Sequence, residues 1–88
     1  MSEDFSKLRK QLELQEWPGV YFYKFIIPND SEKLAKTTAL FNDSVDLAFK
    51  ESKSGKYISV SAKEMMLSID EVISKYQEAT KIKGLISL

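Results

Sequence analysis

The chain contains no cysteine and no histidine among its 88 residues. The absence of cysteine excludes disulfides and thiolate nucleophiles, and the two absences together exclude the usual zinc sites and the common neutral-pH general base. Thirteen basic and thirteen acidic residues cancel, so no overall field recruits nucleic acid or an anionic membrane. We therefore expect no enzyme, no catalytic residues, no bound metal and no cofactor.

Long apolar segments are also absent. The longest apolar run, Val20 to Ile27, is interrupted by Lys24 and is far shorter than the ~20 residues of a membrane-spanning helix. The acidic segment from Met1 to Asp4 lacks the basic region and apolar core of a secretory signal. These features predict a cytoplasmic protein that does not bind a membrane. The length suits a single domain, residues 1–88.

Glycine and proline are scarce, and all five of these residues lie where the hydrophobic pattern changes. Residues 1–16 are predicted to be an N-terminal helical extension, helical over 2–16, with Ser2 as a candidate cap. Alternating or β-branched runs then predict strands, and helical spacing with polar caps predicts helices. The expected order is a strand over 20–27, a helix capped by Asn29, strands over 45–50 and 57–62, a helix capped by Ser68, and a strand over 85–88.

This strand–helix–strand–strand–helix–strand order is that of the ferredoxin-like, or split β-α-β-β-α-β, arrangement. The predicted class is α+β, with a four-stranded antiparallel sheet, two helices on one face and the first and third strands in the middle. Because Lys24 interrupts one phase of the first strand, the other phase, which contains Phe25, is expected to face the helices. The opposite, open face is then expected to hold Val20, Phe22, Lys24, Ile26, Tyr57, Ser59 and Ser61.

Three stretches of the chain resemble the YbeD-like family of small bacterial proteins of unknown function. They are Trp17-Pro18 leading into Tyr23-Lys24-Phe25, the segment Ser-Gly-Lys-Tyr-Ile-Ser-Val-Ser over 54–61, and the final hydrophobic strand. The resemblance spans almost the whole chain and implies an ACT-like fold and a non-catalytic, regulatory-type domain. Two positions depart from the family pattern: Ile58 stands where the family has a histidine, and Glu64 replaces an apolar residue. The second departure predicts an early end of the third strand.

The open face carries the main functional expectation. Its apolar side chains would form a substantial exposed patch, and Phe5, Leu8 and Leu12 of the N-terminal helix are expected to cover part of it. The remainder is expected to bind a protein partner or a second copy of the chain. The predicted interface residues are Val20, Phe22, Lys24, Ile26 and Tyr57.

Three alternatives remain. The helix start at Asn29, Asp30 and Ser31 could receive a small effector's carboxylate, as in the ACT-type domains that the chain resembles, although capping is the simpler interpretation. Lys50, Lys53 and Lys56 at the hairpin tip could hold an anion, or simply favour solubility. Phe22 and Tyr57, placed side by side, would suit stacked bases of single-stranded RNA. The third strand lacks repeated aromatics and the net charge is zero, so no nucleic-acid partner is expected.

Overall fold

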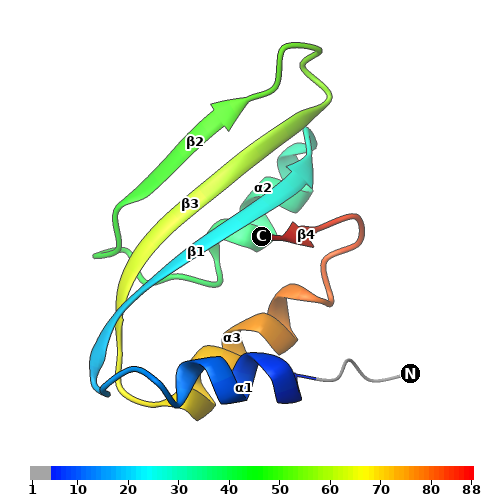
Figure 1. Cartoon of the computed structure of the whole chain (residues 1–88). Helices are drawn as coiled ribbons and strands as arrows, with labels where there is room; N and C mark the ends of the chain where they lie inside the picture. The colour runs from blue at the N-terminus through cyan, green and yellow to red at the C-terminus, as the bar shows by residue number, and fades with distance from the viewer. Residues whose placement is uncertain (1–4) are drawn as a thin grey trace.

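A computed structural model describes residues 5–88 (Figure 1). It is an α+β structure with a four-stranded antiparallel open sheet and three helices. The helices are α1 (Ser6–Leu12), α2 (Ser31–Thr38) and α3 (Ile69–Ala79). The strands are β1 (Gly19–Pro28), β2 (Leu47–Glu51), β3 (Tyr57–Met66) and β4 (Ile86–Ser87). The predicted cap at Ser2 lies outside the described residues.

The sheet has the strand order β2-β3-β1-β4, so the first and third strands lie in the middle, which confirms that part of the prediction. β1 and β3 pair along ten residues each, from Gly19 opposite Met66 to Pro28 opposite Tyr57. β2 pairs with the other edge of β3. The long central pair therefore sets the length of the sheet, about 33 Å at ~3.3 Å per residue.

The fourth strand is much shorter than β1. It pairs with β1 only at Phe25 and Ile26. The backbone N–H of Leu88 donates one further hydrogen bond of 2.9 Å to the carbonyl oxygen of Lys24. The first half of β1 consequently has a neighbouring strand on one edge only.

The third strand runs on to Met66, so the predicted early end is wrong. Glu64 lies opposite Tyr21, on the side of the sheet that the helices cover. Its carboxylate oxygen lies 2.7 Å from the Nζ atom of Lys75 on α3, and both side chains are largely buried. Because Lys75 compensates the buried charge, an acidic residue at this position does not interrupt the strand.

The core lies between the sheet and helices α2 and α3. Tyr23, Phe25 and Ile27 are at most 1% exposed, so the predicted inward phase of β1 is confirmed. Buried residues of β3 and α3 also belong to the core; these are Val60, Ala62, Met66, Val72, Ile73, Tyr76 and Ala79. In Figure 1 the strands pass in front of α2 and no helix lies in front of them, so one face of the sheet stays open.

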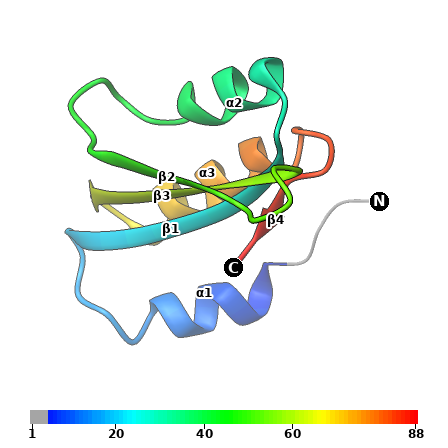
Figure 2. The ribbon, with the colours of Figure 1, turned by 90° about the horizontal axis from the view of Figure 1, so that it is seen from above.

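Helix α1 packs beside α3 at the foot of the sheet (Figure 1). Leu12 is 1% exposed and belongs to the same core cluster as Tyr23, and Phe5 and Leu8 pack against that cluster. The ring centroids of Phe5 and Tyr76 lie 6.4 Å apart. Seen from above, α1 and α2 are the outermost elements, with the strands and α3 between them (Figure 2). The expectation that these three side chains cover the open face is wrong, because α3 offers them a nearer apolar surface.

Candidate binding surface

The uncovered face of the sheet is built from alternate residues of all four strands, because residues paired in register project their side chains to the same side. We call it the open face. It consists of Val20, Phe22, Lys24 and Ile26 of β1, Tyr57, Ser59, Ser61, Lys63 and Met65 of β3, Ala48 and Lys50 of β2, and Ile86 of β4. Four of the five predicted interface residues are thus adjacent on β1, with Tyr57 at one end of β3.

Three exposed apolar side chains of the open face lie where β1 lacks its outer neighbour. Phe22 is 68% exposed, Met65 is 60% exposed and Val20 is 43% exposed. Val20 lies directly opposite Met65, and Phe22 is one open-face position further along β1. Ile26 is half-buried, since β4 places Ile86 beside it. Phe22 and Met65, the two most exposed apolar side chains of the face, therefore lie at this end, while Tyr57 and Ile86, 47% and 54% exposed, lie toward the other end.

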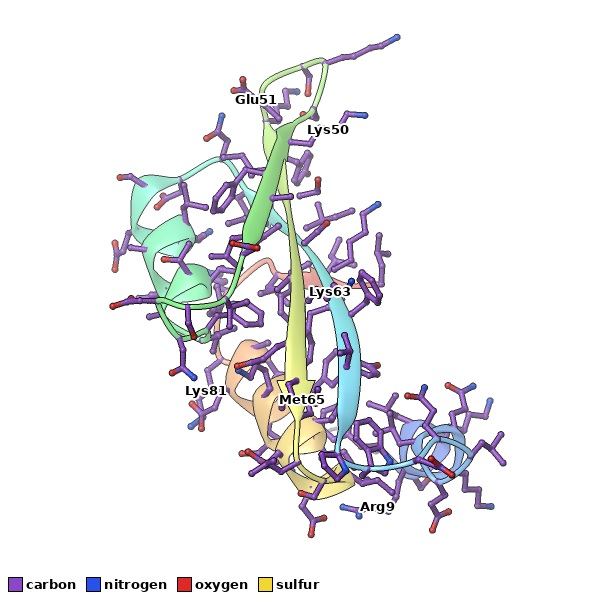
Figure 3. The ribbon with its side chains drawn as sticks, turned by 90° about the vertical axis from the view of Figure 1, so that its left-hand side faces the viewer. Arg9, Lys50, Glu51, Lys63, Met65 and Lys81 are labelled. Carbon is purple, nitrogen blue, oxygen red and sulfur yellow. The ribbon has the colours of Figure 1, made fainter. Side chains whose placement is uncertain are left out.

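Three lysines, Lys24, Lys50 and Lys63, share the open face, whereas none of its strand positions carries a carboxylate. Among residues 5–88 none of these lysines forms an ion pair. The Nζ atom of Lys63 lies 5.4 Å from the centre of the Phe22 ring, within the range of a cation–π contact. Figure 3 shows Lys50 and Lys63 on the side of the sheet away from α2, and Glu51 on the side of α2. The face is thus locally basic in a chain of zero net charge.

The predicted side-by-side arrangement of Phe22 and Tyr57 is wrong. Phe22 lies opposite Lys63, whereas Tyr57 lies opposite Pro28, six positions further along β1. Six residues of strand span about 20 Å. The two rings therefore cannot stack neighbouring bases as adjacent aromatics on central strands do.

Two residues of this face, Lys63 and Met65, were not among the residues that the sequence pattern assigned to it. They lie in the part of β3 beyond Ala62, where the strand was expected to end. The signal that could have found them is the continued alternation of inward and outward positions from Ser61 to Met66. The charge of Glu64 obscured it.

The helix start at Asn29, Asp30 and Ser31 is occupied by its own side chains. The cap is Asp30, not Asn29: Asp30 Oδ1 accepts from the backbone N–H groups of Glu32 and Lys33 at 2.9 and 3.1 Å. Asn29 Nδ2 donates instead across to the hairpin, to Glu51 Oε1 at 2.8 Å and to the carbonyl oxygen of Gly55 at 2.7 Å.

The lysine-rich hairpin tip likewise uses its polar groups internally. Gly55, with a φ of +74°, donates its backbone N–H to the carbonyl oxygen of Ser52 at 2.9 Å. The backbone N–H groups of Lys56 and Tyr57 donate to the hydroxyls of Ser54 and Ser52. Three backbone donors at this tip, those of Gly55, Lys56 and Tyr57, are therefore already engaged within the hairpin. Lys50 belongs to the open face, while Lys53 and Lys56 are exposed.

A second feature lies on the helix-covered side, where Lys75 is held inside a groove of about 590 Å³. Its Nζ atom donates to Glu64 Oε1 and to the carbonyl oxygen of Leu40, both at 2.7 Å, and lies 4.6 Å from the ring centre of Phe41. The Tyr23 hydroxyl is buried without a hydrogen-bond partner in the described chain, and burial raises its pKa. We interpret this arrangement as structural, since the lysine is already compensated.

Among residues 5–88 no helix is long and apolar enough to span a membrane. The same residues hold no cluster of three or more acidic side chains suited to a metal ion. Comparisons of the chain with protein-family models, with curated proteins and with solved structures found no match. A functional assignment must therefore rest on the geometry of the open face.

Proposed function

We propose that the chain is a non-enzymatic binding domain whose open face docks a protein partner. The observation that carries this proposal is the exposure of Phe22 and Met65 on the two central strands, at 68% and 60%. Exposed apolar area is unfavourable by roughly 25 cal/mol per Å², and large patches of it on a monomer are typical of interaction surfaces. The two ten-residue strands, with the five-residue β2 and the two-residue β4 beside them, give the face a footprint of about 400 Å², roughly half of the ~800 Å² that each partner buries in a standard interface.

The finer fold assignment is part of the same proposal. We infer a ferredoxin-like, ACT-like domain, supported by the strand order β2-β3-β1-β4 and by the alternation of strands and helices after α1. The two-residue β4 and the packing of α1 beside α3 are features of this chain in particular. The resemblance to the YbeD-like family agrees with a regulatory-type role but names no partner.

A small effector at Asn29, Asp30 and Ser31 is the less supported form of the proposal, because Asp30 already accepts from the N–H groups that would hold a carboxylate. Single-stranded RNA is the second candidate. It is favoured by one observation, the exposed ring of Phe22 with Lys63 above it. The distant position of Tyr57 argues against it, because a single ring does not form a stacking platform.

Recovery of partners on the immobilised protein tests the proposal. Phe22→Asp places a charge in the centre of the apolar end, and Leu14→Asp is the matched control, since Leu14 is 87% exposed but lies outside the open face. We expect lysate from the source cell to yield at least one protein on the wild type and on Leu14→Asp that is lost on Phe22→Asp. An identical set of proteins on all three would contradict the proposal.

The RNA alternative has its own readout. Retention on immobilised oligouridine, measured over a series of salt concentrations, should be weak and independent of Phe22 if the partner is a protein. Strong retention that falls steeply with salt and is lost in Phe22→Asp would favour the RNA-binding function instead.

A further inference from the structure

The edge of β1 beyond β4 carries free backbone hydrogen-bonding groups. In an antiparallel ladder, a residue directs its N–H and C=O groups to the same neighbouring strand, and successive residues alternate between the two neighbours. Because the carbonyl oxygen of Lys24 accepts from Leu88, the backbone of Lys24 faces the β4 side. The backbones of Phe22 and Val20, two and four residues earlier, face the same side.

No strand lies on the β4 side of Val20 and Phe22, because β4 pairs only with Phe25 and Ile26. Within residues 5–88 the backbones of Val20 and Phe22 form no hydrogen bond on that side of β1. A free edge of this kind is a template for an added strand. The same two residues also expose their side chains on the open face. Free backbone hydrogen-bonding groups and exposed apolar side chains thus lie together over Gly19–Tyr23.

The charges around this edge favour particular side chains in a strand that is added to it. The Lys63 Nζ atom lies over the Phe22 ring, so the ammonium group is drawn from β3 toward β1. Lys24 follows Phe22 on the same face, and neither lysine has a carboxylate partner in the described chain. A second copy of the chain would bring these like charges together, whereas an acidic residue opposite Phe22 and an apolar residue opposite Val20 would complement them.

We propose that the edge of β1 over Gly19–Tyr23 binds an extended segment of a partner protein as an added strand, with acidic and apolar side chains alternating on the open face. This inference rests on the proposed function and specifies how the partner docks. The added strand would continue the line that β4 begins and extend the sheet at its incomplete end.

Titration of the labelled protein with a blocked peptide, Thr-Val-Thr-Glu-Thr-Val-Thr, followed by amide NMR, tests the proposal. We expect saturable shifts and slowed hydrogen exchange at the amides of Val20 and Phe22. Replacing the peptide's glutamate by lysine should weaken binding at least tenfold. Shifts absent from these two amides, or equal binding of the two peptides, would overturn the inference.

Methylation of the peptide's backbone nitrogens provides the matched backbone control. In an added strand, one alternate set of N–H groups faces β1 and the other faces solvent. Methylating one set should abolish binding, and methylating the other should preserve it. Equal effects of both sets would mean that the peptide binds through its side chains alone, which contradicts strand addition.

Val20→Pro separates this inference from the proposed function. It removes an N–H that faces the free edge while the ladder with β3 uses the intervening residues, so the fold should tolerate it. Val20→Ala keeps the N–H and is the control. Loss of the partner recovered from lysate in Val20→Pro, with Val20→Ala unaffected, supports strand addition. Retention in Val20→Pro together with loss in Phe22→Asp would overturn strand addition and leave the docking function standing.

Discussion

Glu64 and Lys75 form an ion pair of 2.7 Å beneath the sheet, with side chains 11% and 14% exposed. The pair joins β3 to α3, and the carbonyl oxygen of Leu40 accepts a second hydrogen bond from the lysine. A buried charge that is paired and hydrogen-bonded is tolerated, but removal of one partner leaves the other without compensation. This relationship explains how β3 continues past an acidic residue.

Breaking this pair should therefore destabilise the protein strongly. Glu64→Ala should lower the free energy of unfolding by about 3–5 kcal/mol, because Lys75 is left as an uncompensated buried charge. The double variant Glu64→Leu with Lys75→Met should lose much less, since no charge remains in the groove. Urea unfolding at neutral pH gives both values. A double variant as unstable as the single one would show that the pair itself supplies the stability.

The side chain of Ser68 should stabilise the N-terminus of α3. Its hydroxyl accepts from the backbone N–H of Glu71 at 3.3 Å, and Glu71 Oε2 accepts from the N–H of Leu67 at 3.0 Å. Ser68→Ala should cost about 1 kcal/mol in urea unfolding, whereas Ser68→Asp should be nearly neutral. Equal destabilisation by both variants would mean that the cap does not act through its acceptor.

Caps and strand phases are local features, and the sequence predicted the Ser68 cap and the inward phase of β1, while it placed the cap of α2 one residue early, at Asn29 instead of Asp30. Lys24 in mid-strand identified the inward phase of β1, and the Ser68 cap is the one that the structure shows. Features that depend on contacts distant in the chain were missed. The continuation of β3 requires Lys75, eleven residues beyond Glu64.

The register of the open face was missed for a related reason. An alternating pattern gives the side of each residue but not its partner on the next strand, so Tyr57 could be placed on the correct face at the wrong end. The spacing of Phe5, Leu8 and Leu12 showed that one side of α1 packs against an apolar surface, but not whether the open face or α3 provides that surface.

The buried hydroxyl of Tyr23 should make the stability of the fold depend on pH in the alkaline range. Burial first, and the nearby charge of Glu64 second, raise the pKa of Tyr23 above its usual value of 10.0. Above pH 10.0 the tyrosine ionises in the unfolded chain while it stays protonated in the folded one. The contribution of Tyr23 to the free energy of unfolding is therefore fully present below pH 10.0 and is lost as the pH rises. The slope is at most about 1.4 kcal/mol per pH unit for this group.

Tyr23→Phe should reduce that alkaline loss without abolishing it, because burial also raises the pKa of Tyr76; urea unfolding over a pH series measures the change. At neutral pH the same variant should be neutral or stabilising by about 1 kcal/mol, because the hydroxyl is buried without a partner in the described chain. Tyr76→Phe is the contrasting variant, since its hydroxyl lies 2.9 Å from that of Tyr21 and its removal breaks a hydrogen bond. Destabilisation of Tyr23→Phe by more than Tyr76→Phe would contradict this account.

Truncation to alanine should change the free energy of unfolding by very different amounts on the two faces of β1. Phe25 is fully buried, and Phe25→Ala should lower the free energy of unfolding by about 3–5 kcal/mol. Lys24→Ala, on the open face, should change it by less than about 1 kcal/mol. Thermal and urea unfolding of both variants provide the comparison. A larger effect of Lys24→Ala would mean that the open face is covered within the folded monomer.

The last prediction concerns stability at the centre of the open face. Phe22→Asp should leave the free energy of unfolding within about 1 kcal/mol of the wild type, because the side chain is 68% exposed and the new carboxylate lies near the ammonium of Lys63. Lys63→Ala in the Phe22→Asp background should then lower stability slightly, by a few tenths of a kcal/mol. Circular dichroism with urea unfolding measures both. Unfolding of Phe22→Asp would show that Phe22 supports the fold itself, so that loss of partner recovery in that variant would no longer report on docking.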